Sequence, residues 1–440
     1  MTFASTPQRQ LILFGRYPVP GKTKTRLIPA LGPLGAAALQ HAFTKQLLAT
    51  VRNGNLSAGV TFCYSGGTVQ QVERWLGRCA IDLRPQKGKD LGQRIHRAFQ
   101  ETLKRGCTQA VLVGTDIPQL SAADLREAFK ALDHNDLVIG PSRDGGYWLI
   151  GLTRNADLFD QIDWGTPRVL SQTMAAARKS GLSVALVAER SDIDTVADLE
   201  AWQPGRPWRR PYLSVIIPAL NEVGRIETTI AAAQSADCEI IVADGGSADG
   251  TADRARAAGA SRVILTGRGR ALQQNAAAEA ARGNVLLFLH ADTILPNRYG
   301  EQVFETLLDP TVVAGAFRFK TDCRRPGMQL IERGVHLRST LLQTPYGDQA
   351  LFVPKPVFSD VGGFPDVAIA EDLALVRRLA KRGRIHIAPG TAVTSGRRWE
   401  DIGLLRATII NTVIAAGCLA GVAPHRLAPL YRLWRKRGDR

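Results

Sequence analysis

Two uninterrupted apolar runs, each followed by an acid, constrain this chain more than any other feature of its sequence. Ala110 to Val113 continues into Gly114-Thr115-Asp116, and Val285 to Leu289 continues into His290-Ala291-Asp292. Runs of this length without polar alternation are typical of parallel strands that are buried on both faces. Ligands of open α/β sheets bind outside the carboxyl ends of such strands, so each aspartate is expected beside a ligand. An aspartate in a turn or a helix cap is the simpler alternative.

A segment rich in proline and arginine divides the chain. Gln203 to Pro211 holds three prolines and three arginines in nine residues, a composition that resists both helix and strand. On each side of it a short apolar strand, Leu11 to Phe14 or Leu213 to Ile217, begins a series of strand and helix units. A length of 440 residues is enough for two cores. We therefore predict two tandem Rossmann-like α/β domains, residues 1–203 and 212–440, with a linker at 204–211.

The composition indicates which cellular compartment and which classes of partner are expected for this protein. The six cysteines are scattered singly, without the close pairs of zinc or dithiol sites, and the first apolar run is too short for a secretory signal. A reduced, cytoplasmic protein is expected. The formal net charge of +16 suits phosphate-rich ligands, an anionic membrane surface or nucleic acid. Because no nucleic-acid-binding motif is present, no nucleic-acid partner is expected.

An apolar stretch near the C-terminus leaves two interpretations open. Residues 407–422 are apolar apart from Thr408, Asn411 and Thr412, and they fall short of the roughly 20 residues that cross a bilayer. One interpretation is a buried helix. The other is a helix in peripheral contact with the cytoplasmic face of a membrane, because basic residues and Trp434 follow it.

Six short strings in the second half fall in a characteristic order. The first two are Ser214 to Glu222 and the glycine-rich string that begins at Asp244, and the later ones are Gly267–Asn275, Leu289–Thr293, Gly362–Phe364 and Glu371-Asp372. Glycines let the backbone approach a ligand closely, and an aspartate beside them can accept hydrogen bonds from a base or a ribose. In order and spacing the strings resemble the family 2 inverting glycosyltransferases of the GT-A fold, over about residues 212–400.

This resemblance implies a role for each matched residue. The diphosphate of a nucleotide sugar would need a divalent cation, Mn²⁺ or Mg²⁺, bound by Asp292; His290 replaces the first acid of the family's metal motif and either binds the ion or packs. Asp372, with Glu371, would take the proton of the acceptor hydroxyl, although acids that begin a helix are the alternative. The resemblance assigns the nucleotide to Pro218, Asn221, Glu222, Asp244, Arg268, Arg270 and Asn275, and the acceptor to Gly347, Asp348 and Gln349.

Basic residues follow the first strand of the other half. Pro18 to Arg26 presents Lys22, Lys24 and Arg26, but its prolines and spacing exclude a phosphate-binding P-loop. Together with the strings Gly88–Arg94, Gly114–Pro118, Asp144–Trp148 and Asp192–Thr195, this half resembles a GT-A nucleotidyltransferase or glycosyltransferase-like family related to 2-phospholactate guanylyltransferases, over about residues 9–202. The resemblance implies that Asp116 and either Asp192 or Asp194 bind a metal ion, and that the basic residues bind phosphates.

The two resemblances together predict a bifunctional enzyme, and the fused arrangement resembles proteins labelled arsenosugar-biosynthesis glycosyltransferases. The second domain would transfer a hexosyl-type sugar to a hydroxyl of a small-molecule or lipid acceptor, and the first would transfer a nucleotidyl or glycosyl group. Arg397-Arg398-Trp399 resembles the end of a motif of processive members, but the preceding glutamine is missing, which favours a single transfer. The alternatives are a membrane-associated enzyme with a lipid acceptor and a nucleotide-binding module with one inactive domain.

Overall fold

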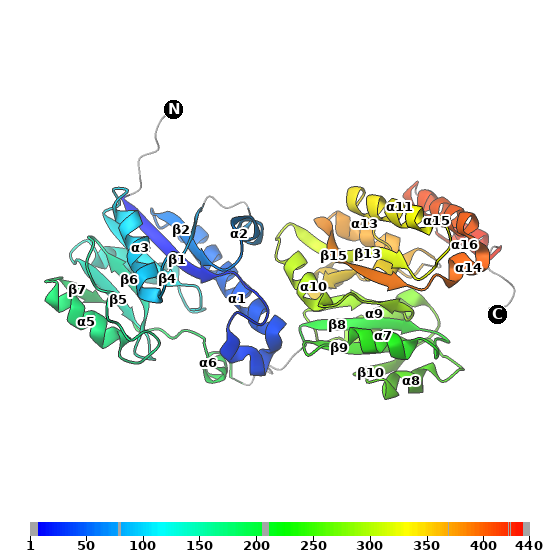
Figure 1. Ribbon diagram of the computed structural model, residues 1–440, viewed down its shortest axis with the longest axis horizontal. Coiled ribbons are helices and arrows are strands. Elements are labelled where there is room, and N and C mark those ends of the chain that lie inside the picture. Colours follow the sequence, from blue (N-terminus) through cyan, green and yellow to red (C-terminus); the bar gives the residue numbers. More distant parts are fainter. Residues whose placement is uncertain are drawn as a thin grey trace, which may run out of the picture. The chain divides into compact units, whose positions relative to one another are not determined.

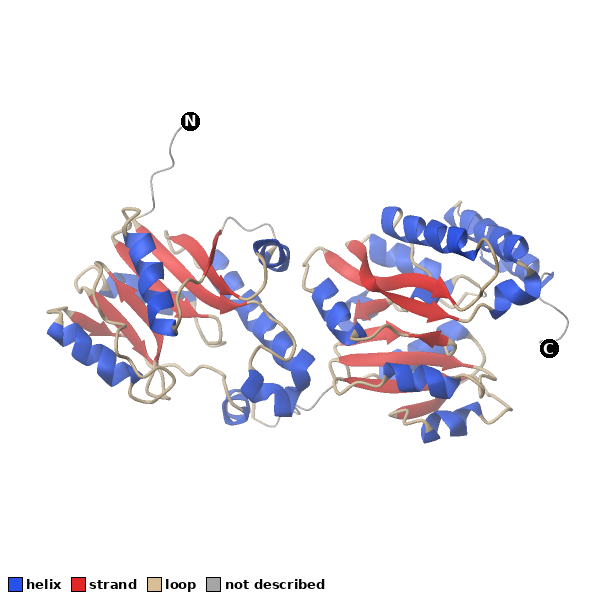
Figure 2. Ribbon diagram, viewed as in Figure 1, coloured by secondary structure: helices blue, strands red, loops and turns tan. Residues whose placement is uncertain are grey.

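The computed structural model describes residues 8–77, 81–204, 211–367, 369–420, 422 and 424–433. The chain forms two compact units, Met1–Trp208 and Arg209–Arg440. In each unit, helices pack around one central sheet (Figures 1 and 2). Most of the predicted linker at 204–211, the residue Cys79 and the basic end of the chain after Leu433 lie outside the described residues.

The first unit contains a seven-stranded sheet with the order β3-β2-β1-β4-β6-β5-β7. The strands β1 to β4 are parallel, and β6 joins β4 in the antiparallel direction. The strands are β1 Arg9–Arg16, β2 Gly59–Ser65, β3 Asp82–Pro85, β4 Gln109–Gly114, β5 Leu137–Pro141, β6 Tyr147–Leu152 and β7 Val184–Leu186. The helices are the 3-10 turn η1 Thr25–Leu27, α1 Ile28–Asn53, α2 Val69–Leu76, α3 Leu91–Leu103, α4 Ala122–Ala131, α5 Val169–Lys179 and α6 Val196–Trp202.

The second unit contains an eight-stranded sheet with the order β10-β9-β8-β11-β14-β13-β15-β12. The strands are β8 Leu213–Ala219, β9 Cys238–Asp244, β10 Arg262–Leu265, β11 Val285–Phe288, β12 Thr293–Ile294, β13 Val312–Thr321, β14 Phe352–Pro354 and β15 Arg384–Thr394. The first helices are α7 Ile226–Ala233, α8 Thr251–Ala257, α9 Arg270–Ala280, α10 Tyr299–Leu307, α11 Met328–Leu341 and the 3-10 turn η2 Gly347–Gln349. They are followed by α12 Lys355–Asp360, α13 Glu371–Ala380, α14 Arg397–Ile402, α15 Leu404–Leu419 and α16 Pro424–Leu433.

Both sheets repeat one strand order. Four parallel strands run 3-2-1-4 in each unit, an antiparallel strand joins the fourth, and two further strands follow. The strand β12 is the one addition to the second sheet, and it pairs with β15. This repetition confirms the predicted fold class of two tandem GT-A domains, and it places the carboxyl ends of β1, β2 and β4 in one unit, and of β8, β9 and β11 in the other, at a common sheet edge.

Burial explains why the apolar runs form the central strands. Every residue of β8 is buried, and Leu11, Ile12 and Leu13 of β1 have no exposed surface. A strand with neighbours on both sides and helices on both faces has no solvent-facing position, so alternation of polar and apolar residues disappears. In the second unit, α9 and α13 complete the core on β8, β11 and β13 with small and aliphatic side chains.

The apolar stretch at residues 407–422 forms most of α15. Its Ala407, Ile410 and Ile414 are buried, whereas Ile409 and Val413 are exposed, so the buried-helix interpretation holds for one face only. Among the described residues, no helix has both the length and the hydropathy needed to cross a membrane.

Candidate active sites at the strand ends

Asp244 lies at the carboxyl end of β9, where the sequence predicts a nucleotide contact. Its Oδ1 accepts hydrogen bonds from the backbone N–H groups of Gly246 and Ser247, both at 2.8 Å. Its Oδ2 is also buried and has no hydrogen-bond donor among the described residues. A buried carboxylate oxygen without a donor is unfavourable, so a ligand that donates a hydrogen bond here would be bound favourably.

The loop after β8 is fastened to the loop after β9. Asn221 has a left-handed backbone (φ 55°), its N–H donates to Ser247 Oγ at 2.9 Å, and its Oδ1 accepts from the Ala248 N–H at 3.0 Å. The next helix, α7, begins only at Ile226, and Arg225 occupies its cap position. Asn221 instead joins the two loops that surround Asp244.

Asp292 and Glu222 share one arginine. Asp292 follows β11 and Glu222 follows β8, whose Pro218 is buried within the strand. The Nη2 atom of Arg397, at the start of α14, lies 3.2 Å from Asp292 Oδ2 and 2.9 Å from Glu222 Oε1. All three side chains are partly exposed. A guanidinium therefore already neutralises the carboxylate for which the sequence predicts a divalent cation.

Asp372, Gly347 and His290 meet at the predicted acceptor side. Asp372 Oδ2 accepts the Gly347 N–H, and its Oδ1 accepts the Leu373 N–H, both at 2.7 Å. A Cβ atom added to Gly347 would lie 2.9 Å from His290 Nε2 and 3.3 Å from Asp372 Oδ2. The imidazole and the carboxylate therefore both lie against the same glycine, which fits only because it has no side chain.

The positive charge of Arg270 lies near both Glu371 and His290. Its Nη1 lies 3.6 Å from Glu371 Oε1. Burial, reinforced by the positive charge of Arg270, lowers the pKa of His290 to about 3, so the imidazole is neutral at physiological pH. Burial raises the pKa of Glu371, and the charge of Asp372 adds to this increase while Arg270 opposes it. The His290 Nε2 is buried and has no hydrogen-bond partner among the described residues.

Arg268 and Asn275 are both predicted to contact the nucleotide, but only the Arg268 side chain is exposed. Arg268 is exposed in the loop before α9, as a phosphate-binding guanidinium would be. Both ends of the Asn275 amide are bound by the backbone of Phe364, whose carbonyl accepts from Nδ2 at 2.8 Å and whose N–H donates to Oδ1 at 3.0 Å. Asn275 therefore fastens α9 to the glycine-rich loop before α13.

Gln349 holds the turn η2, which contains the predicted acceptor residues, through buried hydrogen bonds. Its side chain is fully buried; Oε1 accepts from Ser339 Oγ at 2.8 Å, and Nε2 donates to the Phe317 carbonyl at 2.9 Å. Gln349 thus positions the turn η2, in which Gly347 is buried and Asp348 is half-buried. Both ends of the Gln349 amide are therefore bound by other protein groups.

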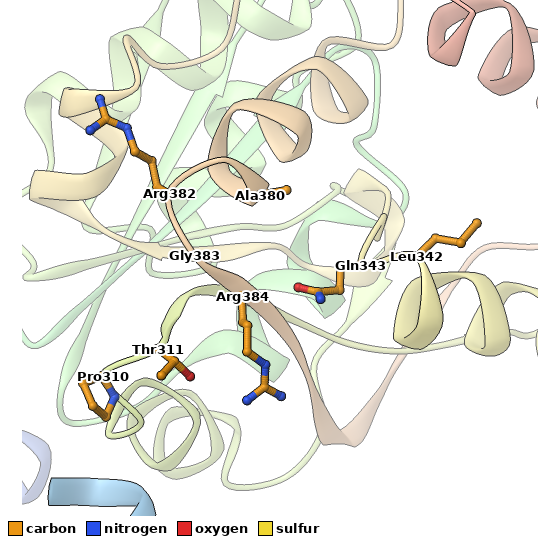
Figure 3. Close-up of a pocket in the computed structure, with 8 residues that line it drawn as sticks. All are labelled: Pro310, Thr311, Leu342, Gln343, Ala380, Arg382, Gly383 and Arg384. Carbon is orange, nitrogen blue, oxygen red and sulfur yellow. The ribbon is translucent and has the colours of Figure 1, made fainter. Parts of the chain in front are cut away.

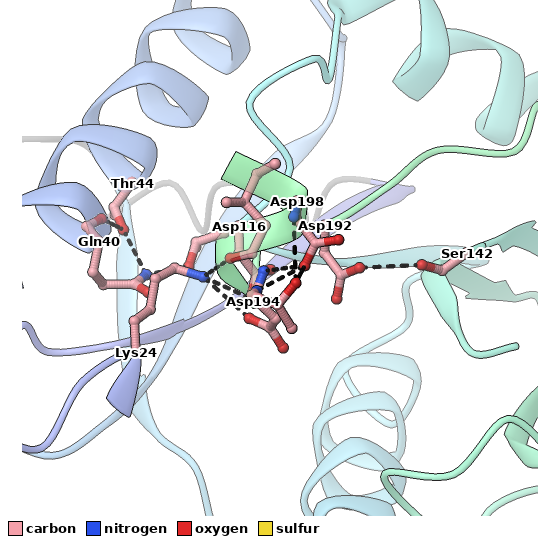
Figure 4. Close-up of polar contacts among 11 residues, drawn as sticks. Lys24, Gln40, Thr44, Asp116, Ser142, Asp192, Asp194 and Asp198 are labelled. Atoms are coloured by element: carbon pink, nitrogen blue, oxygen red, sulfur yellow. Dashed lines mark hydrogen bonds and ion pairs between the residues drawn. The ribbon is translucent and has the colours of Figure 1, made fainter. Parts of the chain in front are cut away.

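The first unit places a lysine among its predicted metal ligands (Figure 4). Lys24 Nζ donates to the Ile193 carbonyl at 2.6 Å, and it lies 3.3 Å from Asp194 Oδ1 and 3.7 Å from Asp116 Oδ2. Its side chain is only 4% exposed. The ammonium therefore occupies the position between the two aspartates that the sequence reserves for a divalent ion, and these residues do not fit such an ion. Lys22 on the same loop and Arg26 in the turn η1 are both exposed.

Asp192 adds a third acid to this cluster. Burial, reinforced by the charges of Asp194, Asp116 and Asp144, raises the pKa of Asp192 to about 6. Its Oδ1 accepts a hydrogen bond from Ser142 Oγ at 3.3 Å. Burial and three neighbouring carboxylates together explain why Asp192 binds its proton more tightly than an exposed aspartate does.

The residues of the second unit fit a divalent cation that the protein and a diphosphate hold together. Among the described residues, no three His, Cys, Asp or Glu side chains are arranged to hold a metal ion by themselves. The side chain of Asp292 is 21% exposed, its Oδ2 is paired with Arg397, and His290 is two residues away. Oxygen ligands of this kind suit Mg²⁺ and Mn²⁺, which commonly take further ligands from substrate phosphates.

A pocket of about 560 Å³ lies at the opposite edge of the second sheet, where β13 and β15 begin (Figure 3). Its lining includes Thr311, Gln343 and Arg384. Arg384 is paired with Asp309 at 3.7 Å, and Gln343 Oε1 accepts the Ile385 N–H. This pocket is separate from the carboxyl ends of the strands, so we assign it no part in the reaction.

The contacts of Arg397 and Lys24 with their carboxylates could not be predicted from the sequence. Arg397 is 105 residues from Asp292 and 175 from Glu222, and only its Arg-Trp string drew attention to it. Lys24 is 170 residues from Asp194, and nothing in its loop distinguishes it from the exposed Lys22. The order of strings reveals which segments share an edge, but it does not reveal which side chains pair there.

The repeated fold and the acids at its strand ends define a class, the transferases of the GT-A type that act on nucleotide-bound substrates. Residues 214–364 match the family model "Glycosyl transferase family 2", and residues 48–166 match "Uncharacterized protein conserved in bacteria (DUF2064)". Residues 214–364 of the second unit thus carry the glycosyl transferase family 2 match that the sequence predicts, and residues 48–166 of the first unit carry the DUF2064 match.

Several known proteins are similar to parts of the chain. Glucosyl-3-phosphoglycerate synthase of Mycolicibacterium paratuberculosis is 38% identical over 117 residues, which are 23% of this chain and 33% of that protein. The corresponding protein of Mycobacterium tuberculosis is 35% identical over 117 residues, 23% of this chain and 34% of that protein. The chain thus spans about a third of the length of these curated relatives.

Two solved structures are also similar. A protein of Desulfovibrio desulfuricans G20, assigned as a nucleotide-diphospho-sugar transferase, is 34% identical, with a TM-score of 0.43, and the match covers 45% of this chain and 87% of that one. Glucosyl-3-phosphoglycerate synthase from Mycobacterium tuberculosis, solved with Mn²⁺, uridine diphosphate and glucosyl-3-phosphoglycerate, is 21% identical, with a TM-score of 0.34, covering 50% of this chain and 83% of that one.

Proposed function

We propose that the second unit transfers a glycosyl group from a nucleoside-diphosphate sugar to an acceptor hydroxyl, with inversion at the anomeric carbon. The observation that carries this proposal is the gathering of three carboxylates, Asp244, Asp292 and Asp372, at one edge of the sheet, each in a different environment. The match to glycosyl transferase family 2 supports it.

Asp244 and the arginines around α9 would bind the donor nucleotide. The buried Asp244 Oδ2 would accept a hydrogen bond from the base or the ribose, which would satisfy an oxygen that has no protein donor. Arg268 and Arg270 are exposed near the same edge and would pair with phosphate oxygens.

Asp292 would hold Mn²⁺ or Mg²⁺ together with the diphosphate. A divalent ion bound there would stabilise the negative charge that develops on the departing diphosphate. Arg397 must release Asp292 when such an ion binds, and its guanidinium would then be available to pair with a phosphate oxygen.

Asp372 would act as the base. The acceptor oxygen attacks the anomeric carbon from the face opposite the diphosphate; the bond from that carbon to the diphosphate oxygen breaks, and its electron pair leaves with the diphosphate. The hydroxyl proton passes to Asp372, whose oxygens each retain a lone pair after accepting one backbone N–H. Those two hydrogen bonds fix the carboxylate, as a base requires.

His290 belongs to the acceptor side in this proposal. Its imidazole is neutral, and its Nε2 lies against Gly347 and near Asp372, without a hydrogen-bond partner in the part of the chain that the structure describes. A neutral imidazole nitrogen in this position would accept a hydrogen bond from an acceptor hydroxyl. Of the two alternatives left open for His290, metal binding or packing, this proposal adopts neither as its function and leaves the metal ion to Asp292.

For the first unit we propose phosphate binding through the exposed Lys22 and Arg26, with Lys24 serving as a fixed cation for Asp116 and Asp194. Nucleotidyl transfer and glycosyl transfer both stay predictions for this unit. The two reactions differ in their products, because nucleotidyl transfer from a triphosphate releases pyrophosphate whereas glycosyl transfer releases a nucleoside diphosphate.

Product analysis of the full chain tests the proposal. The protein is incubated with a panel of nucleotide sugars and nucleoside triphosphates, with Mn²⁺ or Mg²⁺ and with 3-phosphoglycerate among the acceptors. We expect nucleoside diphosphate from a nucleotide sugar, and at least a 100-fold loss of this product in Asp372→Asn. The matched control is Asp253→Asn, whose side chain is 87% exposed on α8. Undiminished release of nucleoside diphosphate by Asp372→Asn would refute the assignment of the base.

A further inference from the structure

We propose that α11 and α15 form a docking surface for an anionic lipid bilayer. The surface consists of Leu330, Leu337 and Leu341 of α11 and Leu405, Ile409 and Val413 of α15, and we call it the α11–α15 face. These six side chains are between 48% and 79% exposed. The proposal concerns binding only, and it does not depend on the proposed reaction.

The exposed residues follow helical spacing on both helices. Leu330, Leu337 and Leu341 are seven and four residues apart, and the opposite side of α11 holds the buried Met328 and Ser339. Leu405, Ile409 and Val413 repeat every four residues on α15. Residues at these spacings lie on one side of a helix, so each helix presents an apolar stripe to solvent.

The two helices are held together beneath this surface. Ile331 and Val335 of α11 pack in the same hydrophobic cluster as Leu404 and Ala407 of α15. Trp399 of α14 is also part of this cluster. Both helices lie along the same side of the second unit (Figure 1). Because their inner sides already form a packed cluster, the outer leucines contribute nothing to the core. An exposed apolar area of this kind marks an interaction site.

Charge favours an anionic bilayer over a second copy of the chain. Arg333 lies within the stripe of α11 and is exposed, and so are Arg406 of α15 and Arg426 of α16. A symmetric dimer through this surface would bring like basic residues together, because a twofold interface places the same surface on both partners. Anionic headgroups complement the arginines while the leucines enter the boundary of the acyl chains.

Vesicle sedimentation tests this proposal with matched variants of the full chain. We expect binding to vesicles of equimolar phosphatidylcholine and phosphatidylglycerol, and much weaker binding to phosphatidylcholine alone. Leu341→Asp and Leu405→Asp should each weaken binding at least tenfold, and Arg333→Gln about fivefold. Leu265→Asp is the control, because Leu265 lies on β10 with 68% exposure, close to the 69% of Leu341.

The thermal unfolding midpoint of each variant should equal that of the unchanged protein, since all four side chains are exposed. Equal binding of the Leu341→Asp and Leu265→Asp variants would overturn the proposal, as would a failure of the unchanged protein to bind vesicles. A dimer in light scattering that Leu341→Asp converts to a monomer, without vesicle binding, would also overturn it and would identify a second copy as the partner.

Discussion

Replacing Gly347 with alanine tests the geometry of the acceptor side directly. The added Cβ would lie 2.9 Å from His290 Nε2 and 3.3 Å from Asp372 Oδ2, whereas ordinary contact begins near 3.4 Å. Either the imidazole must retreat by about 0.5 Å or the turn η2 must move away from α13. Movement of the turn lengthens the hydrogen bond from the Gly347 N–H to Asp372, which is 2.7 Å long.

The expected result is a loss in kcat with little change in the KM for the donor. Displacing a base and its neighbour by a fraction of an ångström lowers kcat roughly 10- to 100-fold, equivalent to about 1.4–2.7 kcal/mol in the activation barrier. The donor is expected at Asp244 and Asp292, which the added methyl does not approach, so donor binding should persist. The assay is release of nucleoside diphosphate at varied donor concentration, with urea unfolding to confirm that the fold is retained.

Two further variants separate the causes. Gly334→Ala on α11 meets nothing within 4 Å, so it should leave kcat unchanged and raise stability by about 0.5–1 kcal/mol. His290→Ala combined with Gly347→Ala removes the nearest obstruction. If the methyl acts by displacing His290, the double variant should be no slower than His290→Ala alone. Wild-type kcat in Gly347→Ala would show that this part of the site is not arranged as described.

Three other substitutions give separate tests. Asp192→Asn should stabilise the protein by about 1–2 kcal/mol above pH 6, less than the roughly 3 kcal/mol of an unscreened pKa difference of about 2. The raised pKa means that ionisation of Asp192 disfavours the fold, so the gain in stability should vanish below about pH 4. Urea unfolding at pH 4 and pH 7 measures this gain, and an equal gain at both pH values would contradict the prediction. Lys24→Met should destabilise the first unit by about 1–3 kcal/mol, because it leaves Asp116 and Asp194 without their cation. It should also let Mn²⁺ raise the unfolding midpoint of that unit, which Mn²⁺ does not do in the unchanged protein. The measurement is made in a background that carries Asp292→Asn, and an absence of any Mn²⁺ response there would disprove the fixed-cation role of Lys24. Arg397→Gln should tighten Mn²⁺ binding to the nucleotide-free protein roughly tenfold, because a competing cation leaves Asp292; calorimetry that finds unchanged affinity would count against competition.

The fold could be predicted because its signals are local. Apolar runs such as Val285 to Leu289 need no knowledge of their neighbours, since burial on both faces removes polar residues from a parallel strand. The recurrence of strand and helix units on both sides of residues 204–211 predicted the two domains of one fold, and the repeated strand order confirms that fold class. The resemblance of the second half to glycosyl transferase family 2 is likewise confirmed, over residues 214–364.

Side-chain pairing could not be predicted, because it depends on which residues the folded chain brings together. Asn221 was predicted to contact the nucleotide, whereas its left-handed backbone directs its amide to the loop after β9. Lys24 resembles Lys22 in sequence, yet it alone is buried between aspartates that lie about 90 and 170 residues away. Asn275 and Gln349 match positions expected at ligands, but the backbone groups that bind their amides come from other elements. Their support of the loops emerges only from the structure.

The central claim is that Asp292 and a divalent ion together hold the diphosphate of the donor. Calorimetric titration of the full chain with the nucleoside diphosphate product, with and without Mn²⁺, tests it most directly. In the unchanged protein Mn²⁺ should tighten nucleotide binding at least tenfold, and in Asp292→Asn it should have almost no effect. An equal enhancement by Mn²⁺ in both proteins would show that the ion binds elsewhere and would contradict the claim.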